Sequence, residues 1–323
     1  MVSSNFWPLI FWPLIIWASI LGDVYGYAHF NMTSRPACLI WQIAWNVKLL
    51  SGLRRNEKII VFIRIFNYQA LQGKRMNVMP KVLIFGATGG IGRQIAQDLA
   101  QKGVALHLVG REQSDVATLA GQLGASYSHA QADDTNSLAE AVKQADDGSG
   151  IAGFVWAIGS ILLKPLAALS EADFIETYRL NVSAPAMAIK AAQKSLKTAN
   201  GAVVLFSSVA ATSGFTSHAA IAAAKAGVEG LGRSLAAEFA PDIRVNVIAP
   251  SLSDTKMAAP LLTNPAMAKG IAQSHPLGRL GIPEDISQLA CLLLDKGAGG
   301  WITGGVFPID GGRGNLASAG RAR

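Results

Sequence analysis

One run of residues carries the strongest structural signal in this chain: Pro80-Lys81-Val82-Leu83-Ile84-Phe85-Gly86-Ala87-Thr88-Gly89-Gly90-Ile91-Gly92. Its first half is a short apolar segment typical of a buried strand, and its second half is a cluster of glycines. An amphipathic stretch follows, with Ile95 and Leu99 four residues apart on one helical face. A strand, a glycine turn and a helix in this order are the context of a dinucleotide-binding fingerprint, because glycines allow close backbone approach and a helix N-terminus attracts phosphate. The sequence therefore predicts that a dinucleotide binds at Gly86, Thr88, Gly90, Ile91 and Gly92.

The residue that follows the second strand indicates which dinucleotide binds. This apolar segment, residues 105–109, ends at Gly110-Arg111, and Arg111 lies nineteen residues after Gly92. NAD binders carry an acidic residue about twenty positions beyond the glycines, where its carboxylate holds the ribose 2′-hydroxyl. A guanidinium at this place suits a 2′-phosphate instead. Arg111 therefore favours NADP(H) over NAD(H), and the alternative is a solvated arginine at a strand end.

Short apolar strands alternate with helical segments through most of the remaining chain. This alternation predicts an α/β domain with a doubly wound parallel sheet. One of these strands, residues 203–206, ends in Ser207-Ser208, and a helical, alanine-rich segment follows. That segment places Ile221 and Lys225 four residues apart, so both lie on one helical face.

The segment from Ser208 to Lys225, taken with the glycine turn, resembles the active site of the short-chain dehydrogenase/reductase family. In that family a Ser is followed thirteen residues later by Tyr, and four residues after that by Lys. Here the Tyr position is Ile221. The resemblance extends from about Lys81 to Gly312. It implies a single domain with a seven-stranded, parallel, Rossmann-type sheet that binds its ligands at the carboxyl ends of the strands.

The resemblance also implies roles for individual residues. Ser208 would orient a substrate carbonyl, and Lys225 would bind the nicotinamide ribose. Asn181 would tie a water molecule to the lysine, and Thr255 would contact the nicotinamide carboxamide. Gly159 matches the last residue of the family's Asn-Asn-Ala-Gly segment after the fourth strand.

Two further implications concern the adenine and the quaternary structure. Asp133 resembles the family's Asp that contacts the adenine, although an Asp here could equally be the N-cap of a helix at 136–144. The segments 172–197 and 219–240 are expected to be long helices. They form dimer interfaces in the family, so we expect a homodimer or homotetramer.

Ile221 has no proton to give, and three hypotheses for the chemistry stay open. The first is an NADP(H)-dependent oxidoreductase that acts on a small or aliphatic carbonyl or alcohol. Its proton would come from His218, seven residues before Lys225, or from Ser208 or a water chain through Asn181. His218 could equally be an ordinary surface histidine. The second hypothesis is a catalytically silent NADP(H) binder that acts as a sensor or partner subunit, and the third is reduction of an activated double bond or an imine.

The first seventy-five residues belong to no fold that the sequence predicts. The run Phe6-Trp7-Pro8-Leu9-Ile10 is repeated at once as Phe11-Trp12-Pro13-Leu14-Ile15. The apolar stretch 6–21 would span about 24 Å as a helix, short of the roughly 30 Å hydrocarbon core, and no Lys or Arg precedes it. A membrane anchor, a cleaved signal and a mis-assigned start before Met76 or Met79 remain as interpretations.

Domain boundaries and partners follow from these patterns. We expect an extension at 1–75, the catalytic domain at 76–316 and a tail at 317–323, with membrane association only if the extension is translated. The chain carries a net charge of +7, but residues 1–75 contribute +6 of it, so no nucleic-acid partner is expected. Cys38 and Cys291 form no disulfide framework and no metal-ligand spacing, which predicts a metal-free protein of the reducing cytoplasm.

Overall fold

A single parallel sheet organises the part of the chain that the computed structural model describes, residues 79–316. The sheet has seven strands in the order β3-β2-β1-β4-β5-β6-β7, and every neighbouring pair is parallel. This confirms the expected doubly wound sheet. Our predictions for residues 1–75 and 317–323 lie outside the described residues. The strands are β1 (Lys81–Phe85), β2 (Leu106–Gly110), β3 (Ser126–His129), β4 (Ile151–Trp156), β5 (Ala202–Phe206), β6 (Arg244–Pro250) and β7 (Val306–Ile309).

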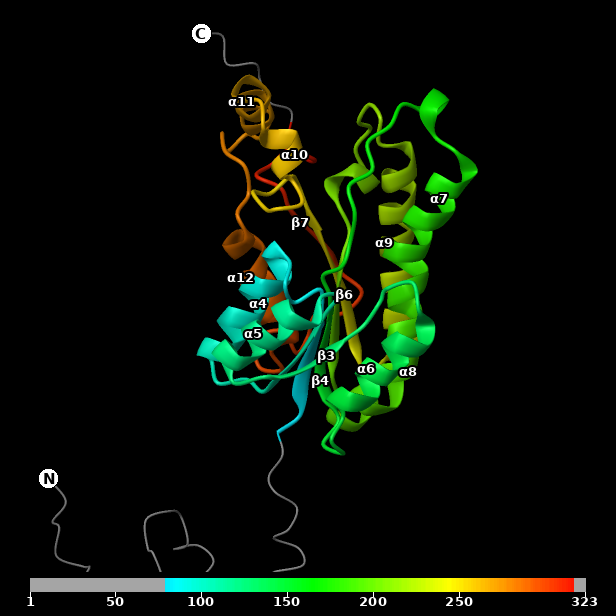
Figure 1. Cartoon of the computed structure of the whole chain (residues 1–323), viewed down its shortest axis with the longest axis vertical. Helices are drawn as coiled ribbons and strands as arrows, with labels where there is room; N and C mark the ends of the chain where they lie inside the picture. Colours follow the sequence, from blue (N-terminus) through cyan, green and yellow to red (C-terminus); the bar gives the residue numbers. More distant parts are fainter. Residues whose placement is uncertain (1–78, 317–323) are drawn as a thin grey trace, which may run out of the picture. The chain divides into compact units, whose positions relative to one another are not determined.

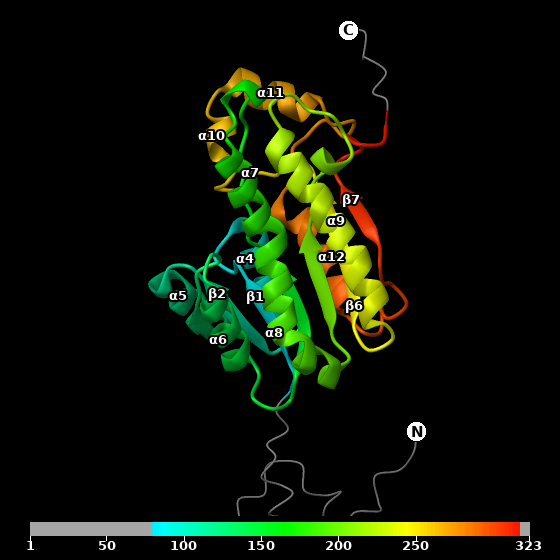
Figure 2. The ribbon, with the colours of Figure 1, turned by 90° about the vertical axis from the view of Figure 1, so that its right-hand side faces the viewer.

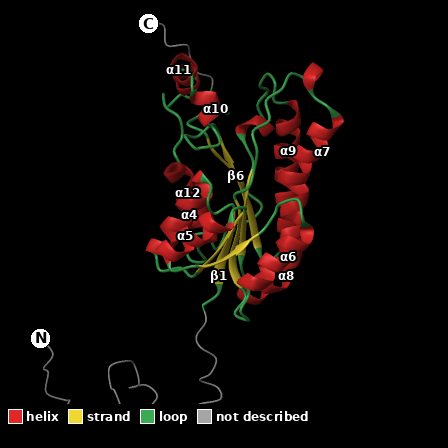
Figure 3. Cartoon of the chain, viewed as in Figure 1, coloured by secondary structure: helices red, strands yellow, loops and turns green. Residues whose placement is uncertain are grey.

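Helices cover both faces of this sheet (Figures 1 and 3). One layer contains α4 (Gly90–Gln101), α5 (Gln113–Leu123) and α12 (Pro283–Leu294). The opposite layer contains α6 (Thr135–Ala145), α7 (Glu171–Tyr178), α8 (Ala184–Ala199) and α9 (Ala219–Phe239). Figure 2 shows α8 and α9 crossing the same face of the strands, while α10 (Ala259–Leu262) and α11 (Pro265–Gln273) lie beyond the carboxyl ends of the strands. Within 79–316, none of the helices has the length and apolar character that a membrane span requires.

The two helical layers explain why the central strands read as continuous apolar runs. In β1, Leu83 and Phe85 join the core beneath α6, α8 and α9, while Val82 and Ile84 join the core beneath α4, α5 and α12. Successive side chains of a strand point to opposite faces, so a strand covered on both sides is apolar at every position. Packing on both faces therefore fixes the ends of the strands. The loops at the carboxyl ends begin from these fixed positions.

The helix that we expected to be continuous over 172–197 is interrupted. A π-helical segment, Arg179–Ser183, separates α7 from α8 and has Asn181 at its centre. Such a π-bulge inserts an extra residue into the helical repeat and is frequent at functional sites. Here the Asn181 side chain is buried, with only 2% of its surface exposed.

Candidate functional site

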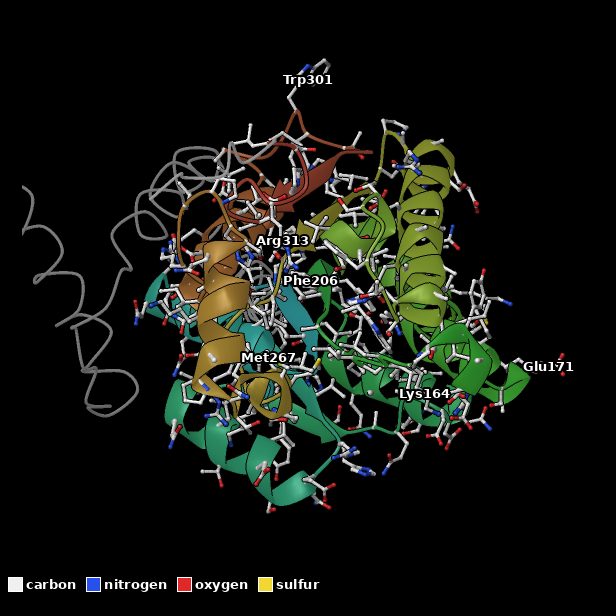
Figure 4. The ribbon with its side chains drawn as sticks, turned by 90° about the horizontal axis from the view of Figure 1, so that it is seen from above. Lys164, Glu171, Phe206, Met267, Trp301 and Arg313 are labelled. Carbon is white, nitrogen blue, oxygen red and sulfur yellow. The ribbon has the colours of Figure 1, made fainter. Side chains whose placement is uncertain are left out.

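A cavity of about 460 Å³ opens at the carboxyl ends of the strands. Figure 4 looks down on this end of the sheet, with Arg313 and Phe206 labelled near the centre and Trp301 and Glu171 projecting at the periphery. The cavity walls come from the glycine turn, the ends of β4, β5 and β6, the start of α9, and α10 and α11. Seven residues singled out in the sequence line it together: Ile91, Gly159, Ser208, His218, Ile221, Lys225 and Thr255.

The glycine turn leaves little room for a Cβ atom at its glycines. Gly86 has φ of +77°, a left-handed conformation that glycine tolerates best. A Cβ on Gly92 would collide with the Gly86 carbonyl oxygen, and one on Gly90 would lie 2.8 Å from the Thr255 methyl carbon. No side chain caps the N-terminus of α4, so its first amides remain available to an anion. These features fit the pyrophosphate of a dinucleotide.

The turn is fastened to the neighbouring strand without the threonine that the family usually places at position 85. Phe85 is fully buried, and its ring packs 5.1 Å from that of Trp156. The backbone amides of Gly86 and Ala87 instead donate to the Val109 carbonyl at 3.0 and 3.1 Å. Aromatic packing and two backbone hydrogen bonds therefore support the turn in place of a side-chain hydroxyl.

Arg111 lies where a ribose-recognising residue is expected, directly after β2. Its side chain is 77% exposed, and its Nε donates to the Glu112 carboxylate at 3.2 Å. An exposed pair of this kind contributes at most about 1 kcal/mol, so a phosphate can displace the carboxylate. Thr88 lies close to the same strand end, because a Cβ on Gly110 would meet the Thr88 methyl at 3.3 Å.

The two acidic residues before α6 have separate roles. Asp134 is the N-cap, and its side chain accepts a hydrogen bond from the Asn136 amide at 2.9 Å. Asp133 is therefore not the cap. Its carboxylate is largely exposed and 4.0 Å from Arg179, so it remains available for the adenine contact that the family resemblance predicts.

Lys225 is a buried amine with no carboxylate partner among residues 79–316. Its Nζ donates to the Phe206 carbonyl at 2.9 Å, and the side chain is buried beneath the cavity floor. Burial penalises the charged form and lowers the pKa of Lys225 from 10.5 to about 8. The amine therefore has two free donor positions facing the region where a ribose would bind.

Asn181 presents an unsatisfied oxygen to the same region. Its amide nitrogen donates to the Thr177 carbonyl at 2.9 Å, while its buried Oδ1 has no hydrogen-bond partner. A Cβ on Gly159 would lie 3.5 Å from both Asn181 Oδ1 and Lys225 Nζ. Buried polar atoms are rarely left unpaired, so this acceptor and the neighbouring amine suit a water molecule or a ligand hydroxyl.

The β5–α9 connection contributes Ser208 and His218, both singled out in the sequence, to the cavity lining. Ser208 Oγ accepts from the Ala210 amide at 3.2 Å, which leaves its proton free to donate into the cavity. His218 is half-buried in the cavity wall, with Nδ1 2.7 Å from the Thr216 carbonyl. Because a carbonyl only accepts, Nδ1 carries a proton and Nε2 is left to exchange protons with a ligand. Ile221, one turn before Lys225, is 5% exposed and adds only hydrocarbon to the wall.

Sequence reasoning missed several polar residues of this cavity, among them Arg313 and Ser251. Arg313 directly follows the motif Asp310-Gly311-Gly312 and comes from the loop after β7. A charged residue immediately after that glycine pair was the available signal. The lining also includes apolar side chains from the segment 257–271, namely Met257, Leu261, Met267 and Ile271.

The parallel sheet in this strand order, the glycine turn at the first helix and the Ser208–Lys225 pair define a nucleotide-dependent oxidoreductase. Residues 86–313 match the family model described as Enoyl-(Acyl carrier protein) reductase. The chain belongs to the short-chain dehydrogenase/reductase family and is an oxidoreductase of that type. It is 32% identical over 238 residues to carbonyl reductase family member 4 of Danio rerio, an alignment that covers 71% of this chain and 96% of that protein.

Solved structures agree with this assignment. A short-chain dehydrogenase/reductase of the glucose/ribitol dehydrogenase type from Brucella melitensis superposes with a TM-score of 0.69 at 29% identity, covering 74% of this chain and 97% of that one. The Pseudomonas aeruginosa RhlG/NADP active-site complex superposes with a TM-score of 0.68 at 26% identity, covering 73% and 96%. Both likenesses cover the described domain almost completely.

Proposed function

We propose that the chain is an NADP(H)-dependent oxidoreductase of a small or aliphatic carbonyl or alcohol, with His218 as its proton donor. The observation that carries the proposal is the convergence of Ser208, His218 and Lys225 on one cavity beside the glycine turn. Ile221 stands where the family resemblance places Tyr, so another group must supply the proton. His218 lies in the cavity wall, and a histidine side chain is the most frequent proton donor in such sites.

Each residue of the cavity would have a separate role in carbonyl reduction. A bound nicotinamide dinucleotide phosphate would supply the hydride to the carbonyl carbon, and the first amides of α4 and Lys225 would hold its pyrophosphate and ribose. Ser208 would donate a hydrogen bond to the substrate oxygen and so stabilise the negative charge that develops there. The proton on Nε2 of the His218 imidazolium would pass to that oxygen, which completes the alcohol and leaves a neutral imidazole. The same residues would run in reverse for alcohol oxidation.

The experiment that tests this function screens the full chain with NADPH against aliphatic aldehydes and ketones. Ser208→Ala and His218→Ala should each lower kcat about a hundredfold or more, because each removes an interaction with the reacting oxygen. Turnover unaffected by His218→Ala would exclude it as the donor. Tight NADPH binding without turnover of any substrate would favour the silent NADP(H)-binding protein instead.

Arg111 is the proposed determinant of NADP(H) preference. We expect Arg111→Asp to weaken NADPH binding about tenfold or more and to leave NADH binding unchanged or stronger, because a carboxylate repels the 2′-phosphate and accepts from the 2′-hydroxyl. Fluorescence titration of both cofactors measures the effect. Glu112→Gln is the matched control, and it should tighten NADPH binding by releasing Arg111 from its ion pair. Equal losses for both cofactors in Arg111→Asp would contradict the assignment.

A second candidate function is the reduction of an activated carbon–carbon double bond. The observation that favours it is Ile221, because an apolar wall at this position suits a substrate whose protonation occurs on carbon rather than on a carbonyl oxygen. The description of the matching family model also names an enoyl reductase. An α,β-unsaturated ketone in the substrate screen separates the two, since only this second function yields the saturated ketone.

The proposed setting follows from the family. We expect a homodimer or homotetramer in the cytoplasm, with α8 and α9 at the interface between subunits. Small-angle scattering or sedimentation of the full chain measures the assembly.

A further inference from the structure

Two cations and no carboxylate line the cavity within the described residues. Lys225 lies at its floor beside Asn181 and Gly159, where the ribose is expected. Arg313 lies in a different part of the wall, with its guanidinium carbon 4.6 Å from the centre of the Phe215 ring. Its described side-chain contacts are with Phe215 and with Ser251, which directly follows β6. None of these contacts comes from the glycine turn. The cofactor phosphates therefore do not explain this arginine.

The other arginines with recorded contacts show what a satisfied guanidinium looks like in this fold. Arg279 makes a bidentate pair with Asp285, at 2.6 and 2.8 Å. Arg244 donates to several carbonyl oxygens at the end of α12, among them that of Leu293 at 2.7 Å. Arg313 has one long hydrogen bond, from its Nη1 to Ser251 Oγ at 3.4 Å. No acidic side chain pairs with it among residues 79–316, so most of its five donors are unused.

Arg313 is nevertheless held in position. The Phe215 face stacks on it and adds a cation–π attraction. Behind Ser251 lies His275, which is 2% exposed, with Nδ1 2.8 Å from the Ile271 carbonyl and Nε2 2.8 Å from Ser251 Oγ. Nδ1 carries the proton that the carbonyl accepts, and Ser251 Oγ lies within hydrogen-bond distance of both Nε2 and Arg313 Nη1. The serine oxygen then turns a lone pair toward Arg313.

We propose that Arg313 binds the carboxylate of an aliphatic oxo acid or hydroxy acid, with the apolar side chains of α10 and α11 covering its chain. A planar guanidinium with free donors matches a carboxylate in bidentate geometry. A half-buried cation in a mainly hydrocarbon wall is strongly stabilised by an anion, because little water competes for it. Leu261, Met267 and Ile271 line the same cavity and suit the aliphatic part. The reduction of such an acid rests on the proposed function. The binding of its carboxylate does not.

The binding test needs no turnover. The full chain, saturated with NADPH, is titrated calorimetrically with octanoate and with octanamide, which has the same chain but no charge. We expect octanoate to bind at least about tenfold more tightly than octanamide, as a charge-assisted bidentate pair implies. In Arg313→Gln the two probes should bind equally, with octanamide unchanged. Arg313→Lys should retain part of the preference, and Lys143→Gln, an exposed site on α6, should retain all of it.

The outcomes separate this inference from the proposed function. Equal binding of both probes to the unaltered chain would overturn it, as would an octanoate preference that survives in Arg313→Gln. Unchanged NADPH affinity in Arg313→Gln shows that the variant is folded. A chain that prefers octanoate but reduces no carbonyl would retain the carboxylate site and lose the enzymatic proposal. If it turns over, the ratio of kcat/KM for an oxo acid to that for its methyl ester should fall about tenfold in Arg313→Gln.

Discussion

Ile221→Tyr should raise the rate of carbonyl reduction by about 10²- to 10⁴-fold, the range typical of a positioned general acid. The phenol would stand one helical turn before Lys225 on α9, facing the cavity that Ile221 already lines. The Lys225 ammonium would favour the phenolate and lower the tyrosine pKa toward neutral pH. Because the cavity is open beside Ile221, it can accept the larger ring. The measurement is kcat/KM with NADPH for a panel of aliphatic ketones, with the unaltered chain assayed in parallel.

The matched control is Ile221→Phe, which adds the same ring without the hydroxyl. Phe should give no gain, so any difference between the two variants belongs to the proton. Adding His218→Ala to the Tyr variant should then cost little, because the phenol has taken over its proposed role. A Tyr variant that binds NADPH normally but is no faster than the Phe variant would show that Ser208 and Lys225 are not positioned for carbonyl reduction.

Lys225→Met should abolish turnover and at the same time stabilise the cofactor-free protein. The folded pKa of Lys225, about 8, lies below its ordinary 10.5 because burial penalises the ammonium. Below pH 8 both states are protonated, and the folded chain bears the full cost of that buried charge. Methionine removes the charge and keeps the hydrocarbon stem. We expect the free energy of unfolding at pH 7 to rise by about 1 to 3 kcal/mol, less what the lost hydrogen bond to Phe206 contributes.

The buried charge of Lys225 also predicts how the stability of the folded chain changes with pH. Between pH 8 and 10.5 the unfolded chain binds more protons at this residue than the folded chain, so the contribution of Lys225 makes stability increase with pH in that window. That increase should be absent in Lys225→Met, and urea unfolding of both chains at pH 7 and pH 10 measures it. Lys143→Met, on the exposed surface of α6, is the control and should change neither value. A destabilised Lys225→Met with no change in pH dependence would show that the lysine is not a buried cation.

The layered sheet could be predicted because its signals are local. The apolar side chains of the run 81–85 predict a buried strand, and the backbone freedom of the glycines after it predicts a turn. Both signals lie in adjacent residues. The spacing of Ser208 and Lys225 likewise places both near one strand end. The interruption at Asn181 could not be predicted in the same way. A π-bulge leaves almost no signal in the sequence, because one inserted residue hardly disturbs the apolar periodicity of a long helix.

The class of protein, the glycine turn after the first strand and the isoleucine at position 221 could all be recognised from the amino-acid order alone. Each depends on the identity and spacing of residues within a single strand, turn or helix. The folded chain was needed to show that Lys225 is a buried amine, that the unpaired oxygen of Asn181 lies near it, and that Arg313 reaches the cavity. These properties arise where loops from distant parts of the chain meet at the ends of parallel strands. Burial and free hydrogen-bond donors are properties of that packing, and no local pattern encodes them.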